Sequence, residues 1–361
     1  MKMKNIVLLL SAFAVIVSLN SCSKEKPKAS GPDDRIYVIA DSAEFQDFKA
    51  SLDSVFGKII YTPQPEKTFE LIRRNFSDLE SLKNSPNILI IAPMNSNSGV
   101  SAYIRSLLND STKQGVNAGR EFQFNRHDLW AKGQLVMILT ARDMPTLREK
   151  LHAENGALLE MFRKASVRKL VQSLYMDKYE NKDIEAKFLK EYGWLIYVQK
   201  DYDLVLDKPQ DKFVWLRSLK GNDMAKWIFV HWIDNASPDF LNRDSIIKQR
   251  NRLTQKYLKP AGSGKFVKMT DEYQTTSEVN FHNKYALLTQ GLWEMSDRSM
   301  GGPFINYTMF DDKTKRIYML DGSIYAPKYL KKNLIRQLDV LLQSFMTEHE
   351  IDPVKKKELG R

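Results

Sequence analysis

The sequence predicts an α+β protein with mixed or mostly antiparallel sheets packed against helices. Short apolar and β-branched runs, which are typical of strands, recur between longer segments in which apolar residues are three or four positions apart, as on one helix face. The two kinds of segment do not alternate strictly, which argues against a purely parallel sheet. With 361 residues, 43% of them hydrophobic, the chain can bury one large core or two moderate ones.

The first half, residues 34–180, is predicted to be a mixed α/β unit. Asp143 is placed to cap its longest helical region, with Pro145 in the first turn. The predicted strands are residues 35–40, 68–74, 88–92 and 134–141, and the predicted helices are residues 42–56, 98–108 and 145–174.

In the second half, residues 181–348, three strands followed by a helix are predicted twice. This order suggests an internal duplication of a βββα unit, although the residues themselves show no clear repeat. Ser237, Pro238 and Asp239 form a start signal for the first helix. The predicted strands are residues 194–199, 213–219, 226–233, 284–295, 303–310 and 315–320, and the helices are residues 237–258 and a terminal helix from Pro327, before a basic tail at 349–361.

The N-terminus has the plan of a bacterial secretory signal. Lys2 and Lys4 precede the apolar run Ile6–Leu19, which is shorter than the roughly 20 residues that a bilayer-spanning helix needs. We therefore expect export rather than a transmembrane anchor.

The four residues LNSC at 19–22 resemble the lipobox of bacterial lipoproteins. In that family the residue before the cysteine is small, as Ser21 is, so that a signal peptidase can cut there, and the thiol carries a diacylglyceryl group. The resemblance implies that residues 1–21 are removed and that Cys22, the only cysteine of the chain, is lipidated. An uncleaved anchor and an ordinary signal with a chance cysteine are the alternatives.

Residues 22–33 are expected to be a flexible tether, because Pro, Gly and Ser replace apolar side chains there. Surface-exported lipoproteins of the Bacteroidota often carry an acidic cluster after the cysteine, whereas this chain has Lys24, Glu25 and Lys26. We therefore expect it to face the periplasm from the outer membrane. The formal net charge of +11 allows an anionic partner, although a basic surface without a partner is the simpler interpretation. Anionic lipid, glycan or an envelope protein fits that location, and nucleic acid does not.

Several blocks are similar to those of an uncharacterised Bacteroidota lipoprotein family that is described only as a domain of unknown function. The similarity runs from about Asp34 to Phe345, and it implies an envelope location but no activity. The blocks are PQPE at 63–66, NILII at 87–91, WAKGQ at 130–134, GLWEM at 291–295, MGGPF at 300–304 and LDGSIYAP at 320–327.

The five histidines form no metal-binding pattern, because no two of them lie four apart on a helix. His231 and Asp234 are three apart, but on a strand they would face opposite sides of the sheet. We therefore expect no metal and no cofactor. The histidines are His127, His152, His231, His282 and His349.

Two sets of residues are candidates for binding. The first is a groove around the MGGPF loop, in which the carboxylates could also act as acid and base on a glycan, although turn formation alone accounts for the glycines. The second is a ridge of cations on the terminal helix, opposite its apolar stripe, which could meet an anion, although a solvated face is the simpler interpretation. The groove set is Trp293, Glu294, Asp297, Gly301, Gly302 and Asp321, the ridge set is Lys328, Lys332 and Arg336, and the stripe is Leu330, Leu334, Leu338, Leu341 and Phe345.

These observations together predict a lipid-anchored envelope protein that binds or assembles without catalysis. The alternative is an envelope hydrolase acting on glycan or peptidoglycan through the groove carboxylates.

Overall fold

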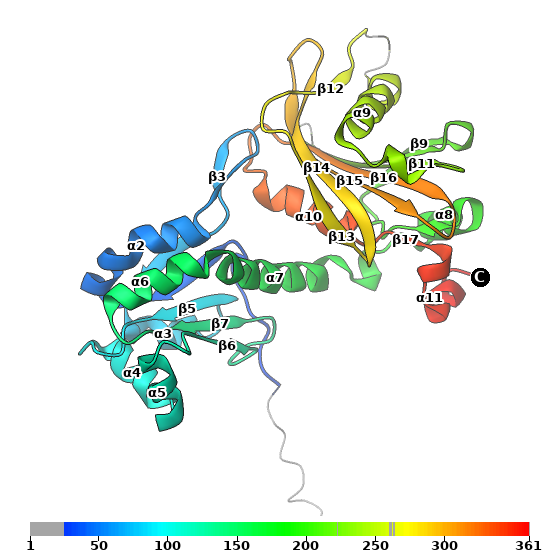
Figure 1. The fold of residues 1–361 in the computed structure, drawn as a ribbon. Coiled ribbons are helices and arrows are strands. Elements are labelled where there is room, and N and C mark those ends of the chain that lie inside the picture. The colour runs from blue at the N-terminus through cyan, green and yellow to red at the C-terminus, as the bar shows by residue number, and fades with distance from the viewer. Residues whose placement is uncertain (1–24, 222, 260–261, 263, 361) are drawn as a thin grey trace, which may run out of the picture.

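The computed structural model describes residues 25–221, 223–259, 262 and 264–360, which form two domains joined by helices (Figure 1). The signal segment, its Ser21 flank and Cys22 lie outside these residues. None of the described helices is long and apolar enough to cross a membrane.

The N-terminal domain is built on a five-stranded sheet in the order β4-β1-β5-β7-β6. Its first four strands are parallel, and the edge strand β6 is antiparallel to β7. The central strands β5 and β7 are buried on both faces, which explains their unbroken apolar sequences. The strands are β1 (Arg35–Ile39), β4 (Glu70–Arg74), β5 (Asn87–Ile91), β6 (Gln123–His127) and β7 (Leu135–Leu139).

Helices cover both faces of this sheet. One face packs its apolar side chains against α2, α6 and α7, and the other packs against α3, α4 and α5. Asp143 caps α6 as predicted, because its carboxylate accepts the backbone N–H of Thr146 at 2.9 Å. The helices are α2 (Ser42–Phe56), α3 (Leu79–Leu82), α4 (Gly99–Leu107), α5 (Asp110–Asn117), α6 (Met144–Ala153) and α7 (Asn155–Leu174).

The C-terminal domain contains an antiparallel sheet in the order β12-β14-β15-β16-β11-β10-β9, with β13 also paired to β14. The predicted α+β class with mostly antiparallel pairing is thereby confirmed. The strands are β9 (Asp203–Lys208), β10 (Phe213–Lys220), β11 (Met224–Ile233), β12 (Val267–Met269), β13 (Thr275–Phe281), β14 (Lys284–Met295), β15 (Gly301–Asp311) and β16 (Arg316–Tyr325).

Two helices cover opposite faces of this sheet. Phe229 of β11 packs in the core that contains Leu253 of α9 (Arg243–Tyr257), whereas its neighbour Val230 packs with Leu338 of α10 (Lys332–Leu342). The order of three strands and a helix does recur, as β9–β11 with α9 and as β14–β16 with α10. If the two units were a duplication, a two-fold axis perpendicular to the sheet, between β11 and β16, would relate them. That axis would place α9 and α10 on the same face, whereas they lie on opposite faces, so the arrangement is not a simple duplication.

Several predicted segments have other bounds in the structure, and the helical region predicted over 145–174 is divided at Glu154 into α6 and α7. Only Trp194–Leu195 of the predicted strand 194–199 is extended, as β8, which pairs with β17 (Met346–Thr347). Ser237 starts a 3-10 turn, and the helix itself begins at Arg243 because Asn242 caps it.

Several further elements were not expected from the sequence. They include α3, α5, β6, β9, β12 and β13, the hairpin strands β2 (Ile59–Tyr61) and β3 (Pro65–Lys67), the helix α8 (Lys182–Tyr192) and the short C-terminal helix α11 (Pro353–Glu358). The β2–β3 hairpin leaves the N-terminal domain and lies beside the C-terminal one (Figure 1). It forms one side of the interface between the domains.

Candidate functional site

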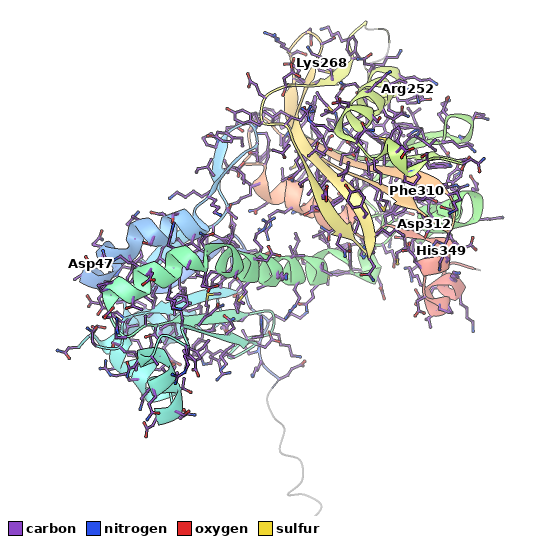
Figure 2. All side chains as sticks on the ribbon, viewed as in Figure 1. Asp47, Arg252, Lys268, Phe310, Asp312 and His349 are labelled. Carbon is purple, nitrogen blue, oxygen red and sulfur yellow. The ribbon has the colours of Figure 1, made fainter. Side chains whose placement is uncertain are left out.

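The predicted groove does not bring its three carboxylates together. Glu294 pairs with Lys268 at 3.1 Å, and Figure 2 shows Lys268 at the outer end of the C-terminal domain. Asp297 pairs with Lys265 at 2.6 Å. Asp321 is fully buried under α9, where Arg250 donates to it at 2.6 Å. With each carboxylate paired to its own cation, the acid and base arrangement of a hydrolase is not formed here.

Trp293 and the glycines serve the packing of the sheet. The Trp293 indole donates to the carbonyl of Ile324 at 3.1 Å. A Cβ atom on Gly302 would lie 1.9 Å from that same carbonyl oxygen, so only glycine fits there. Trp293 also lines an apolar cavity of about 270 Å3 with Trp215 and Trp227, which we call the tryptophan cavity.

The predicted cation ridge is not present as a continuous line. The helix begins at Lys332, five residues after Pro327, so Lys328 lies before it and pairs with Asp223 at 2.8 Å. Leu330, expected on the apolar stripe, is for the same reason 71% exposed. The rest of the stripe packs on the sheet as predicted: Leu338, Leu341 and Phe345 are buried, and Leu334 is partly buried.

Lys332 and Arg336 instead face the N-terminal domain. Lys332 is buried, pairs with Asp34 at 2.9 Å and donates to the carbonyl of Lys67 at 2.7 Å. Arg336 lies one turn further along α10 and lines a cavity of about 250 Å3 between the domains, the interdomain cavity. The β2–β3 hairpin, α7, α10 and the sheet of the C-terminal domain all contribute to its wall.

Arg336 is the unusual group in this wall. It forms no hydrogen bond or ion pair with any residue that the structure describes, and burial lowers the pKa of its guanidinium. The neighbouring carboxylates are engaged elsewhere: Asp34 pairs with Lys332, and Asp33 pairs with Lys169 at 2.7 Å. Because both neighbouring carboxylates already pair with lysines, the N–H groups of the Arg336 guanidinium have no acceptor among the described residues.

Other polar groups surround Arg336. Arg163 of α7 reaches the rim, and its nearest described carboxylate, that of Glu160, is 4.0 Å away. Gln290 and Thr68 add neutral polar side chains to the wall. The carboxylate of Asp339 is held by the Tyr307 hydroxyl, which donates to it at 2.7 Å. The cavity therefore offers positive charge and hydrogen-bond donors to an anion.

The histidines lie apart from this cavity. His231 is buried under α9, and burial lowers its pKa to about 4. His349 lies beside Asp312 and Phe310 near α11 (Figure 2), with its Nε2 atom 3.5 Å from Asp311. Over the part of the chain that the structure describes, no three His, Cys, Asp or Glu side chains are grouped as metal ligands.

Comparison with known proteins identifies two families. Residues 29–175 match a family described as Domain of unknown function (DUF8532), and residues 181–344 match Domain of unknown function (DUF4837). The expected similarity to a family described only in those terms is confirmed.

Similarity to solved structures is weak. A mutant of Protein Mog1 is 9% identical, aligns with 43% of this chain and 90% of its own, and has a TM-score of 0.29. The Saccharomyces cerevisiae Ran-binding protein Mog1p is 8% identical with the same coverage and a TM-score of 0.30. No curated protein matches the sequence. No conclusion about function follows from these similarities.

Sequence reasoning missed Arg163, Gln290 and Thr68 as members of the interdomain cavity. They come from three segments of the chain that no local pattern links, and only the packing of the two domains brings them together. Arg336 was singled out because a third cation at i, i+4 spacing has no use in helix formation. That signal identified the residue but not the surface that it faces.

Proposed function

We propose that this protein is a lipid-anchored envelope protein, facing the periplasm from the outer membrane, that binds a small anion between its two domains without catalysing a reaction. The guanidinium of Arg336, half-buried in the interdomain cavity and unpaired among the described residues, is the observation that carries this proposal. Cavities between domains are common binding sites, and guanidinium groups favour carboxylate and phosphate ligands.

The proposed anion carries a carboxylate or phosphate group. Arg336 would donate to it from α10, Arg163 would contribute charge from α7, and the amide of Gln290 would add a neutral donor. The apolar side chains of Phe69 and Ile335 in the same wall suit the body of an organic anion better than a bare ion.

The hydrolase alternative has less support in the geometry. A glycosidase needs two carboxyl groups about 5 to 10 Å apart on either side of the substrate. Glu294 and Asp297 instead form ion pairs with lysines, and Asp321 has no exposed surface. Binding without catalysis is therefore the better proposal.

Calorimetric titration of the full chain in detergent tests this proposal. The probes are inorganic phosphate and a short-chain, soluble phosphatidylglycerol, which distinguish a free phosphate from a lipid headgroup. Arg336→Gln should weaken binding of the preferred probe by about 10- to 100-fold, because a charge-assisted hydrogen bond contributes roughly 1.5 to 3 kcal/mol. Arg168→Gln is the matched control, since that arginine is on α7 but outside the cavity wall. Equal affinities for the Arg336→Gln variant and the wild type would refute the anion site.

A further inference from the structure

A further cavity, of about 390 Å3, lies where α8, α11 and the segment after α7 meet the residues that follow α10. Three acidic residues, Asp177, Glu180 and Glu185, are in its wall, together with Lys355 of α11. We call it the acidic cavity. It shares no lining residue with the interdomain cavity.

Glu185 is the least expected of these acids, because its side chain has no exposed surface. One carboxylate oxygen, Oε1, accepts the backbone N–H of Val198 at 2.9 Å. The other, Oε2, has no hydrogen-bond donor among the described residues, and the Lys355 ammonium is 3.6 Å from it. Burial, together with the adjacent Glu180 carboxylate, raises the pKa of Glu185 to about 8.

The charges around Glu185 do not balance. Lys355 forms its closest ion pair with Glu180, and Lys182 lies 3.9 Å from the same carboxylate. Glu358 of α11 competes for both lysines, at 3.9 Å from Lys355 and 3.7 Å from Lys182. Glu185 therefore shares its one nearby cation, Lys355, with Glu180 and Glu358, and it lies next to open volume.

Two aromatic rings complete the wall. Tyr175 and Tyr197 lie with their ring centroids 4.7 Å apart. Their hydroxyls donate to backbone carbonyls, at 2.5 Å to Val340 and 2.9 Å to Leu174, so both rings are fixed in place. Aromatic rings beside carboxylates are the usual surroundings of bound organic cations.

We propose that the acidic cavity binds a small organic cation through a primary ammonium group, which donates to Oε2 of Glu185 beside Lys355. The ammonium supplies the hydrogen-bond donor that Oε2 of Glu185 lacks, and the carbon chain of the ligand lies against Tyr175 and Tyr197. Glu185 gives its proton to solvent when the cation binds. The ammonium charge bound to Glu185 then takes the place of the released proton.

A dependence of affinity on pH follows from this exchange. Below the pKa of Glu185 the cation must displace a proton, so its affinity should rise by about tenfold per pH unit and level off above pH 8. The groups facing Glu185 are Glu180 and, from α11, Lys355, with Lys182 and Glu358 behind them. Asp177, Tyr197 and His282 lie in the same cavity wall.

Calorimetric titration of the full chain in detergent with cadaverine, at pH 6.5 and pH 8.5, tests the proposal. We expect about 25-fold tighter binding at pH 8.5 than at pH 6.5, with one proton released per cation at pH 6.5, as measured in buffers of different ionisation enthalpy. The uncharged analogue 1,5-pentanediol should not bind. Glu185→Gln should abolish both the binding and its pH dependence, while Glu278→Gln, an exposed change on β13, should alter neither.

Lys355→Met separates a binding role from a structural one. Removing the internal cation should tighten cadaverine binding several-fold at pH 8.5, although it breaks an ion pair. Binding that is unchanged by pH, or that Glu185→Gln leaves intact in a folded protein, would overturn the proposal. So would a complete lack of binding in the wild type. None of these outcomes depends on the anion site, which phosphate titration tests separately.

Discussion

Glu66 caps the N-terminus of α10 from the opposite domain, where its carboxylate accepts the backbone N–H of Lys332 at 3.2 Å. The same carboxylate accepts the N–H of Lys331 at 2.8 Å and a hydrogen bond from the hydroxyl of Thr62. No side chain of α10 itself caps this end. The helix that carries Arg336 therefore begins where the β2–β3 hairpin supplies its acceptor.

Glu66→Ala should lower the free energy of unfolding by about 1 to 2 kcal/mol, because it removes a buried charged cap from two backbone donors. Urea unfolding followed by tryptophan fluorescence measures this change, since five of the six tryptophans lie in the C-terminal domain. Glu70→Ala, which removes only an exposed pair with Arg35, should cost no more than about 0.5 kcal/mol. Equal effects of the two changes would argue against the capping role.

Asp321→Asn should destabilise the protein by about 3 to 5 kcal/mol, because it leaves the fully buried guanidinium of Arg250 without a counter-charge. Ser323 and Asn306 also form hydrogen bonds with this pair, but both side chains are neutral, so they cannot replace the lost charge. Replacing both partners together, with Arg250→Met and Asp321→Leu, should recover most of the loss in the same unfolding assay. A loss below 1 kcal/mol for Asp321→Asn would contradict the importance of the pair.

The spacing of apolar residues along the sequence predicted the strands and helices that bury a regular set of apolar side chains. The apolar run of β5 and the helical spacing in α2 depend on neighbours in the sequence, and both elements lie where they were expected. The start of α10 was placed five residues too early, at Pro327, because apolar spacing continues through Leu330. The acceptor that fixes the true start is Glu66, 266 residues away from Lys332.

The candidate sites were harder to predict for the same reason. Glu180 and Lys355 are 175 residues apart and meet only because α11 folds back onto α8. Single residues such as Arg336 and Gly302 were singled out in the sequence, Arg336 as a cation with no use in helix formation and Gly302 as a turn residue. Their partners were not, because partners are chosen by the packing of domains.

Gly302→Ala should prevent folding or cost more than about 3 kcal/mol, because the new Cβ would clash with backbone atoms of β16 that have little freedom to move. Gly156→Ala is the matched control: a Cβ there meets no atom within 4 Å, and alanine is favoured inside a helix by up to about 1 kcal/mol. Yield of folded protein and urea midpoints measure both effects. A Gly302→Ala protein as stable as the wild type would show that β15 and β16 can move apart.

Cys22→Ala should abolish attachment of lipid, because the chain has no other thiol. Labelling of cells with a fatty-acid probe, followed by fractionation, should show a lipidated membrane form for the wild type and none for the variant. Ser23→Ala, at the neighbouring position, should leave labelling unchanged. Equal labelling of wild type and Cys22→Ala would exclude the predicted anchor.

Acid should destabilise the protein through His231, whose folded pKa of about 4 lies below the usual value of 6.5. The unfolded chain binds the proton more tightly, so stability falls as the pH decreases from 6.5 to 4, by on the order of 3 kcal/mol. The neutral ring is held between the carbonyl of Lys212, at 2.8 Å, and the amide of Gln249, at 2.7 Å. Protonation would place a charge among buried apolar side chains.

His231→Gln removes the group that titrates. The difference in the free energy of unfolding between this variant and the wild type should therefore depend on pH. Urea unfolding at pH 7 should favour the wild type, which keeps both hydrogen bonds of the ring. Near pH 4.5 that difference should shrink by about 2 to 3 kcal/mol, because only the wild type pays the cost of a buried proton. His127→Gln, at an exposed position of β6, should follow the wild type at every pH. A constant difference between wild type and His231→Gln across this range would show that His231 titrates normally in the folded protein.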